Sequence, residues 1–178
     1  MATKNWVTDP THSEIKFKIK HLMITNVTGS FDIFNVSAQT EDEDFTKTKI
    51  SFTADVNSIS TGNEQRDSHL KSEDFFDAAN HPQVKFTATK YEAVDNDGSF
   101  TLYGDLSIRE TTKNVKLDVE FGGVVKDPYG NTKAGFTING KINRKDFGLK
   151  WDAVTEAGGI VVSHEVRIAC EIQLIEQQ

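Results

Sequence analysis

Apolar and polar side chains alternate along most of this chain, the period of a β-strand with one buried and one solvated face. The clearest run is EIKFKIK at 14–20, where apolar and charged residues strictly alternate. The same period marks residues 50–56, 84–88 and 115–121. Less regular strands are expected at 27–36, 99–108, 133–142 and 165–175. The pattern therefore predicts about eight antiparallel strands.

Turn-forming residues separate several of these strands. DNDG at 95–98 and DPYGN at 127–131 carry the Asp, Asn, Pro and Gly that tight turns require, so successive strands are expected to be hairpin neighbours. Residues 62–77 interrupt the alternation and are expected to form short helical turns, with Thr61 or Asn63 as the N-cap. Their apolar side chains are expected to tuck under a sheet edge or a barrel end.

Strands of this length favour a closed sheet. An up-and-down barrel uses long strands and leaves no free edge, whereas a sandwich usually has shorter ones. We therefore predict an all-β fold, an eight-stranded antiparallel up-and-down barrel with a short helical segment near residues 62–77. Residues 1–178 are expected to form a single domain, because one hydrophobic core usually serves a chain of this length.

The alternation of side chains along each strand, here called its parity, predicts which apolar residues lie inside the barrel. Eight strands enclose either a core filled by side chains or room for one small ligand, and periodicity alone leaves both open. The residues expected to line an interior tunnel are Phe17, Ile19, Phe31, Ile33, Phe52, Ala54, Phe86, Ala88, Leu102, Leu106, Leu117, Val119, Phe136, Ile138, Ile168 and Cys170.

Composition excludes several classes of function. The net charge of −7 argues against a nucleic-acid partner, since such affinity is built from clustered Lys and Arg. A single cysteine forms no disulfide within the chain, and no apolar run approaches the length of a membrane helix. The first residues contain no apolar signal core, so a cytoplasmic location is expected, or a periplasmic one if a leader has been removed.

Catalytic and metal-binding motifs are not found. The five histidines do not form a metal-ligand pattern, and no Gly-x-Ser-x-Gly turn supports a nucleophile, so neither an enzyme nor a metal site is expected. The polar residues that stand out are His12, Arg66, Asp67, His69 and Arg144. Each has two interpretations, a structural hydrogen bond or a place at the polar mouth of a tunnel.

Five short segments carry a resemblance to a known family. They are DPTHS at 9–13, RDSHL at 66–70, HPQVKF at 81–86, GDLSIR at 104–109 and NRKDFG at 143–148. Together and in this order they resemble the YceI-like family of lipocalin-like, polyisoprenoid-binding proteins. One departure is Glu110, where the family pattern usually has a glycine. A turn that needs a positive φ would be strained there.

The resemblance implies an apolar tunnel that takes an isoprenoid lipid, either a polyprenyl lipid or an isoprenoid quinone, without a covalent bond. Transport, storage or sequestration of that lipid is the implied function. The alternative is a structural or stress-related interaction protein with a filled barrel. Pairing of two barrels into a homodimer stays open.

Overall fold

Long antiparallel strands form most of the computed structural model, which describes residues 2–22, 24–94, 99–149 and 162–177. The strands of these ranges are β1 Thr3–Thr8, β2 Glu14–His21, β3 Thr25–Phe31, β4 Phe34–Glu41, β5 Asp44–Asp55, β6 Ile59–Ser60, β7 Gln83–Ala93, β8 Phe100–Ile108, β9 Thr111–Lys126, β10 Thr132–Asn143 and β11 Val162–Gln177. The helices are α1 Glu64–Leu70 and the 3₁₀ turns η1 Pro10–His12, η2 Val56–Ser58 and η3 Arg144–Phe147.

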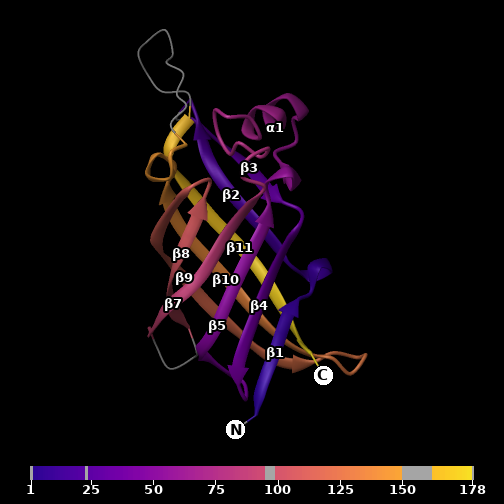
Figure 1. The fold of residues 1–178 in the computed structure, drawn as a ribbon. Coiled ribbons are helices and arrows are strands. Elements are labelled where there is room, and N and C mark those ends of the chain that lie inside the picture. The colour runs from indigo at the N-terminus through magenta and orange to yellow at the C-terminus, as the bar shows by residue number, and fades with distance from the viewer. Residues whose placement is uncertain (1, 23, 95–98, 150–161, 178) are drawn as a thin grey trace.

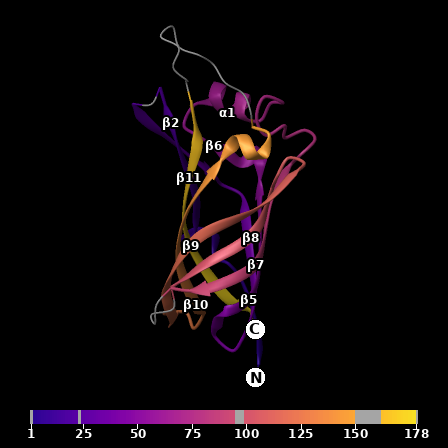
Figure 2. The same cartoon turned by 90° about the vertical axis from the view of Figure 1, so that its left-hand side faces the viewer.

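Eight of the strands close a ring in the order β1-β4-β5-β7-β8-β9-β10-β11, and pairing of β1 with β11 completes it. The predicted eight-stranded antiparallel barrel is confirmed. The other three, β2, β3 and β6, extend the wall beyond β1, because β1 pairs with residues 174–177 of β11 and β2 pairs with residues 162–171. Both views show an elongated barrel with α1 at one end and the two termini at the other (Figures 1 and 2).

Two strand predictions need correction. The strand expected at 27–36 is broken between β3 and β4, where the Asp32 amide donates to the Ser58 carbonyl and the Asp55 amide to the Ile33 carbonyl. The bend resets the parity, so Ile33 is 61% exposed and its expected inward orientation is wrong. The other error is β1, which was not predicted although it completes the ring.

The barrel end near the termini is filled by aromatic rings. Phe45 lies 5.0 Å from both Trp6 and Phe136, measured between ring centroids, and Phe121 lies 5.3 Å from Phe136. Trp6 is 1% exposed, and its indole nitrogen donates to the Thr40 hydroxyl at 2.9 Å. This aromatic cluster forms the floor of the barrel interior.

The opposite end is covered by residues 61–80, here called the cap segment. As expected, a helix forms here, and the Asn63 side chain caps α1 by accepting from the Arg66 amide at 3.0 Å. Phe76 packs edge-on against Phe31 of β3 at 5.9 Å. Arg109, in the β8–β9 turn, donates to the carbonyls of Glu73 and Phe75, each at 3.2 Å. The cap segment is thereby tied to two sides of the barrel.

The β8–β9 turn contains Glu110, the position where a positive φ would cause strain. Its positive φ, 55°, belongs to Arg109, and Glu110 lies outside the left-handed region. A glycine is therefore not needed at position 110, and the strain expected there is absent.

Candidate functional site

A cavity of about 410 Å³ runs inside the barrel from the aromatic floor to the cap segment. This volume lies within the roughly 300–1,000 Å³ of typical small-molecule pockets. Most of the wall is apolar. The tunnel residues predicted from parity that line it are Phe17, Ile19, Phe31, Phe52, Phe86, Leu102, Leu106, Leu117, Val119, Phe136, Ile138, Ile168 and Cys170. The cap segment adds Leu70, Phe75 and Phe76.

Glycines on neighbouring strands make room for two of the inward rings. A Cβ added at Gly29 would stand 2.3 Å from the Phe17 ring, and one added at Gly104 would stand 2.2 Å from the Phe86 ring. The rings therefore lie flat against bare backbone. The predicted small partners Ala54 and Ala88 do not line the cavity, although Ala54 is buried in the wall.

The cap end of the cavity carries the polar part of the lining. Thr61, Arg66 and His69 reach it from the cap segment. His21 reaches it from the end of β2, and Arg144 from the start of η3. Lys16 is also on the lining. Among the described lining residues no aspartate or glutamate occurs, so the formal charge at this end is positive.

Hydrogen bonds fix the orientation of the polar groups from the cap segment. Arg66 donates from Nε to the Thr61 hydroxyl and from Nη2 to the Thr61 carbonyl, both at 2.7 Å. His69 Nε2 lies 2.8 Å from Asp74 Oδ2, and its ring packs edge-on against Phe75 at 5.1 Å. Arg66 and His69 thus have the structural roles considered from the sequence and also line the cavity.

Arg144 is 2% exposed and ties η3 to β11. Its guanidinium donates to the carbonyls of Leu149 at 2.7 Å and Ser163 at 2.9 Å. A buried guanidinium needs such acceptors, because it cannot lose its charge. The structural interpretation of Arg144 is therefore supported, while its place on the lining keeps a fixed charge near the cavity.

Two polar residues predicted at the mouth lie elsewhere. His12 is in the corner between β1 and β2, with Nδ1 2.7 Å from Asp9 Oδ2, and it does not line the cavity. Asp67 is not on the lining, although it accepts from the backbone and hydroxyl of the lining residue Thr61 at 2.9 and 2.6 Å. Adjacency in sequence placed Asp67 beside Arg66, but successive side chains of a helix point in different directions.

Sequence reasoning missed Phe45, which lines the cavity near its floor. Its parity is opposite to that of Ile50 and Phe52 on the same strand. The β4–β5 pairing shifts register between Gln39 and Glu41, and this irregularity lets Phe45 turn inward. No local signal in the sequence marks such a shift.

Cys170 lines the cavity without a redox partner in the chain. Burial raises the pKa of its thiol to about 12, so the residue acts as a small apolar wall group. In the described ranges there is no group of three or more His, Cys, Asp or Glu side chains placed to hold a metal ion. None of the helices in those ranges is long and apolar enough to cross a membrane.

The ring of strands and the enclosed cavity define a lipocalin-like barrel with an apolar interior and a polar end. The chain belongs to the YceI-like family, whose domain model matches residues 6–174. The resemblance found in the sequence motifs is therefore confirmed.

Known relatives support the same assignment. A UPF0312 protein of Staphylococcus aureus (strain MSSA476) is 38% identical over 164 residues, which cover 92% of each chain. The crystal structure of a Campylobacter jejuni YceI protein has a TM-score of 0.76 and 34% identity, over 90% of this chain and 91% of that one.

A more distant structure shows the same fold. It is described as a polyisoprenoid binding domain from Saccharophagus degradans, and it has a TM-score of 0.67 and 16% identity over 97% of this chain and 98% of its own.

Proposed function

We propose that this chain binds one isoprenoid lipid in the barrel cavity, with the tail along the apolar wall and the polar head beside Thr61, Arg66 and His69. The observation that carries the proposal is the distribution of polarity. Apart from Lys16 in the wall, the lining is apolar from the aromatic floor upward, and its other basic side chains gather at the cap end. A long amphipathic molecule has the same distribution.

The energetics support such a ligand. Each buried CH₂ contributes about 0.8 kcal/mol, so ten enclosed carbons supply about 8 kcal/mol towards the cost of ordering a flexible chain. The basic side chains on the lining of the cap end favour an anionic head, such as that of a polyprenyl phosphate, over a neutral quinone, although Asp74 already pairs with His69. No covalent bond is required, which suits a protein that transports, stores or sequesters its lipid.

The cavity argues against the alternative, an interaction protein with a filled barrel. Protein interiors normally pack to the density of organic crystals with few voids larger than a water molecule. An apolar cavity of about 410 Å³ is far larger than such a void. The fold similarity to the polyisoprenoid binding domain from Saccharophagus degradans is consistent with a lipid in this space.

Native mass spectrometry tests the proposal directly. The purified chain is extracted with organic solvent, analysed for bound lipid and reloaded with a polyprenyl phosphate or an isoprenoid quinone. We expect one lipid per chain. A chain that is isolated empty and takes up neither lipid would overturn the proposal.

A pair of tryptophan variants separates the cavity from the outer surface. Ile138→Trp adds volume to the cavity wall, whereas Val125→Trp adds the same ring at a position that is 64% exposed and off the lining. We expect Ile138→Trp to retain less lipid with an unchanged circular dichroism spectrum, at an overpacking cost of about 1–3 kcal/mol. Val125→Trp should retain lipid as the original chain does.

A further inference from the structure

The outer face of β2, β11, β10 and β9 carries a row of basic side chains. Lys18 of β2 pairs in register with Arg167 of β11, and Arg167 pairs with Lys141 of β10. Lys116 follows on the outer face of β9, and Lys113 is added near the start of β9, at the opposite strand parity. All five are exposed. The chain as a whole has a net charge of −7, but this face carries a group of positive charges.

These basic residues surround a groove in the barrel wall. The last pair joining β9 to β10 is Leu117 with Gly140, yet β9 begins six residues earlier, at Thr111, and β10 continues to Asn143. The two strands separate there, and all five basic residues line the resulting groove. Two acidic residues, Asp118 and Asp146, also line it. We call this surface the basic face.

Only a thin wall separates the groove from the cavity. Val115, Ile142 and Ile168 are on the lining of both, one contributed by each of β9, β10 and β11. The groove therefore lies directly outside the apolar interior.

Much of the positive charge on the basic face is not neutralised by salt bridges. Lys141 and Arg167 share Glu165, at 4.0 and 3.4 Å. Lys18, Lys113 and Lys116 form no salt bridge with any residue that the structure describes. Lys116 interacts electrostatically with Glu92 beyond salt-bridge distance, so the charges of Lys18 and Lys113 are the most available to a partner of opposite sign.

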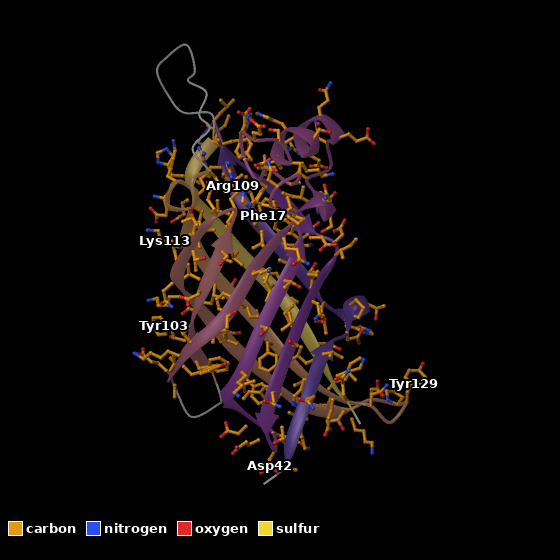
Figure 3. The ribbon with its side chains drawn as sticks, in the orientation of Figure 1. Phe17, Asp42, Tyr103, Arg109, Lys113 and Tyr129 are labelled. Atoms are coloured by element: carbon orange, nitrogen blue, oxygen red, sulfur yellow. The ribbon has the colours of Figure 1, made fainter. Side chains whose placement is uncertain are left out.

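A concentrated set of acidic residues lies elsewhere. Glu41, Asp42, Glu43 and Asp44 form the β4–β5 turn, at the barrel end near the termini. Figure 3 shows Asp42 at that end and Lys113 in the half nearer α1. Charges separated by more than the Debye length, about 8 Å at physiological salt, are largely screened. The acidic turn therefore does little to cancel the field of the basic face.

Two exposed apolar side chains lie in the turn between β2 and β3. Leu22 is 40% exposed and Ile24 is 78% exposed, and they follow His21, which lines the cap end of the cavity. Leu22 has a φ of 51°, a left-handed conformation that glycine or asparagine adopts at lower cost. Leu22 and Ile24 are here called the β2–β3 tip.

We propose that the basic face and the β2–β3 tip dock this protein on an anionic phospholipid bilayer. Peripheral membrane binding combines attraction between basic residues and anionic headgroups with shallow insertion of apolar side chains. Both components are present here, and His21 connects the tip to the cavity lining. This inference goes beyond ligand binding, because it concerns the outer surface and holds for any cargo of the cavity.

Vesicle sedimentation tests the proposal with the full chain. Vesicles of phosphatidylcholine alone are compared with vesicles of phosphatidylcholine and phosphatidylglycerol, at low and high ionic strength. We expect binding to the mixed vesicles at low ionic strength, and release of the protein by salt because screening weakens surface attraction. No binding to the mixed vesicles at low ionic strength, or equal binding to both compositions, would overturn the proposal.

Charge-matched variants locate the docking surface. Lys18→Glu, Lys113→Glu and Lys116→Glu together are expected to lower partitioning onto mixed vesicles by about a hundredfold, since each basic residue near an anionic membrane contributes about fivefold. Lys49→Glu, Lys85→Glu and Lys126→Glu change the net charge equally at exposed strand positions outside the groove, and should bind far more strongly than the first variant. Equal loss in the two triple variants would mean a net-charge effect and would contradict the assignment.

Matched serine variants test the tip. Leu22→Ser with Ile24→Ser should weaken vesicle binding, whereas Val94→Ser with Val125→Ser, at positions 66% and 64% exposed, should not. Lipid retention by native mass spectrometry is measured on every variant. Docking variants that keep their bound lipid but lose vesicle binding support the docking proposal. A chain that binds vesicles but never holds a lipid would contradict only the proposed isoprenoid ligand.

Discussion

Asp9 is the residue that fixes the corner between β1 and β2. Its carboxylate is 2.7 Å from Lys133 Nζ and 2.7 Å from His12 Nδ1, and it accepts from the Thr11 amide and hydroxyl at 3.2 and 2.9 Å. Burial alone would raise the pKa of Asp9, but the hydrogen bonds from Lys133, His12 and Thr11 outweigh it and lower that pKa well below its usual range. The ionised carboxylate therefore stabilises the corner.

Replacing Asp9 should remove this stabilisation. Asp9→Asn is expected to lower the free energy of unfolding by about 2 kcal/mol at neutral pH, the usual contribution of hydrogen bonds to a charged group. Because folding lowers the Asp9 pKa, its contribution is complete above about pH 4 and is lost as the pH falls toward the folded-state value. Urea unfolding at neutral and acidic pH should show that the free energies of unfolding of the variant and the original chain become equal in acid. Asp118→Asn, at an exposed strand position, is the control and should have little effect at any pH.

Arg66 has a structural contact and a charge on the cavity lining, and a substitution can separate them. Arg66→Ala should weaken retention of a polyprenyl phosphate more than that of a quinone with the same tail, because a charge-assisted contact is lost while apolar burial is unchanged. Native mass spectrometry of both complexes measures the ratio of retained polyprenyl phosphate to retained quinone. Thr61→Val removes a hydrogen-bond partner of Arg66 but leaves the charge, so its ratio should stay close to that of the original chain. Equal weakening of both lipids by Arg66→Ala would make the arginine a structural tie only.

At the scale of elements, the cap segment buries Phe75 and Ala78, but none of its residues belongs to a strand. Arg109 contacts it from the β8–β9 turn, and Phe76 contacts β3. A segment outside the strand ladders opens more readily than the strands beneath it. The cap segment is therefore the element expected to move when a ligand enters or leaves.

Arg109→Gly should loosen the cap segment without disturbing the turn. Glycine accepts the φ of 55° at this position, so the hairpin keeps its shape while both hydrogen bonds to the cap segment are lost. Hydrogen exchange of residues 71–78 should accelerate by about fivefold, corresponding to about 1 kcal/mol of local stability. Release of a bound lipid should accelerate as well. Unchanged exchange in this segment would contradict the assigned role of Arg109.

At the scale of the whole molecule, the aromatic floor sets the depth of the cavity. Phe136 is 9% exposed, lines the cavity and packs against Phe45 and Phe121. A side chain of different volume here should change the longest tail that fits. The position is therefore a test of whether the lipid tail points to the floor.

Phe136→Trp should shift retention towards shorter polyprenyl phosphates, and Phe136→Leu towards longer ones. The expected stability costs are about 1–3 kcal/mol for the larger side chain and about 1 kcal/mol for each lost aromatic pair. Native mass spectrometry with a mixture of tail lengths gives the distribution for each variant. Phe121→Leu, in the same cluster but off the cavity lining, should leave the length preference unchanged. If all three variants retain the same lengths as the original chain, the tail does not reach the floor.

Much of the barrel wall could be predicted from the sequence, because the direction of a side chain on a strand follows from local parity. Phe17, Phe52, Phe86 and Leu117 all lie on the lining as expected. The turn residues at 127–131 and the break in alternation at 62–77 also marked real boundaries, while the turn predicted at 95–98 lies outside the described residues. These features depend on interactions within a few residues, which a single sequence displays directly.

Closure of the ring and assembly of the polar end were decided only by the tertiary structure. Trp6 pairs with Glu176 and lies almost the whole chain length away in sequence, so no local pattern marks β1 as the closing strand. Ile33 departed from its expected side because a bend changes the parity, and Phe45, which was not in the predicted set, turns inward at a register shift. Arg66 reached the cavity and Asp67 did not, because the direction in which α1 presents each side chain depends on how it packs across the barrel end. Local alternation determines which residues avoid water, and long-range packing determines which of them share a cavity.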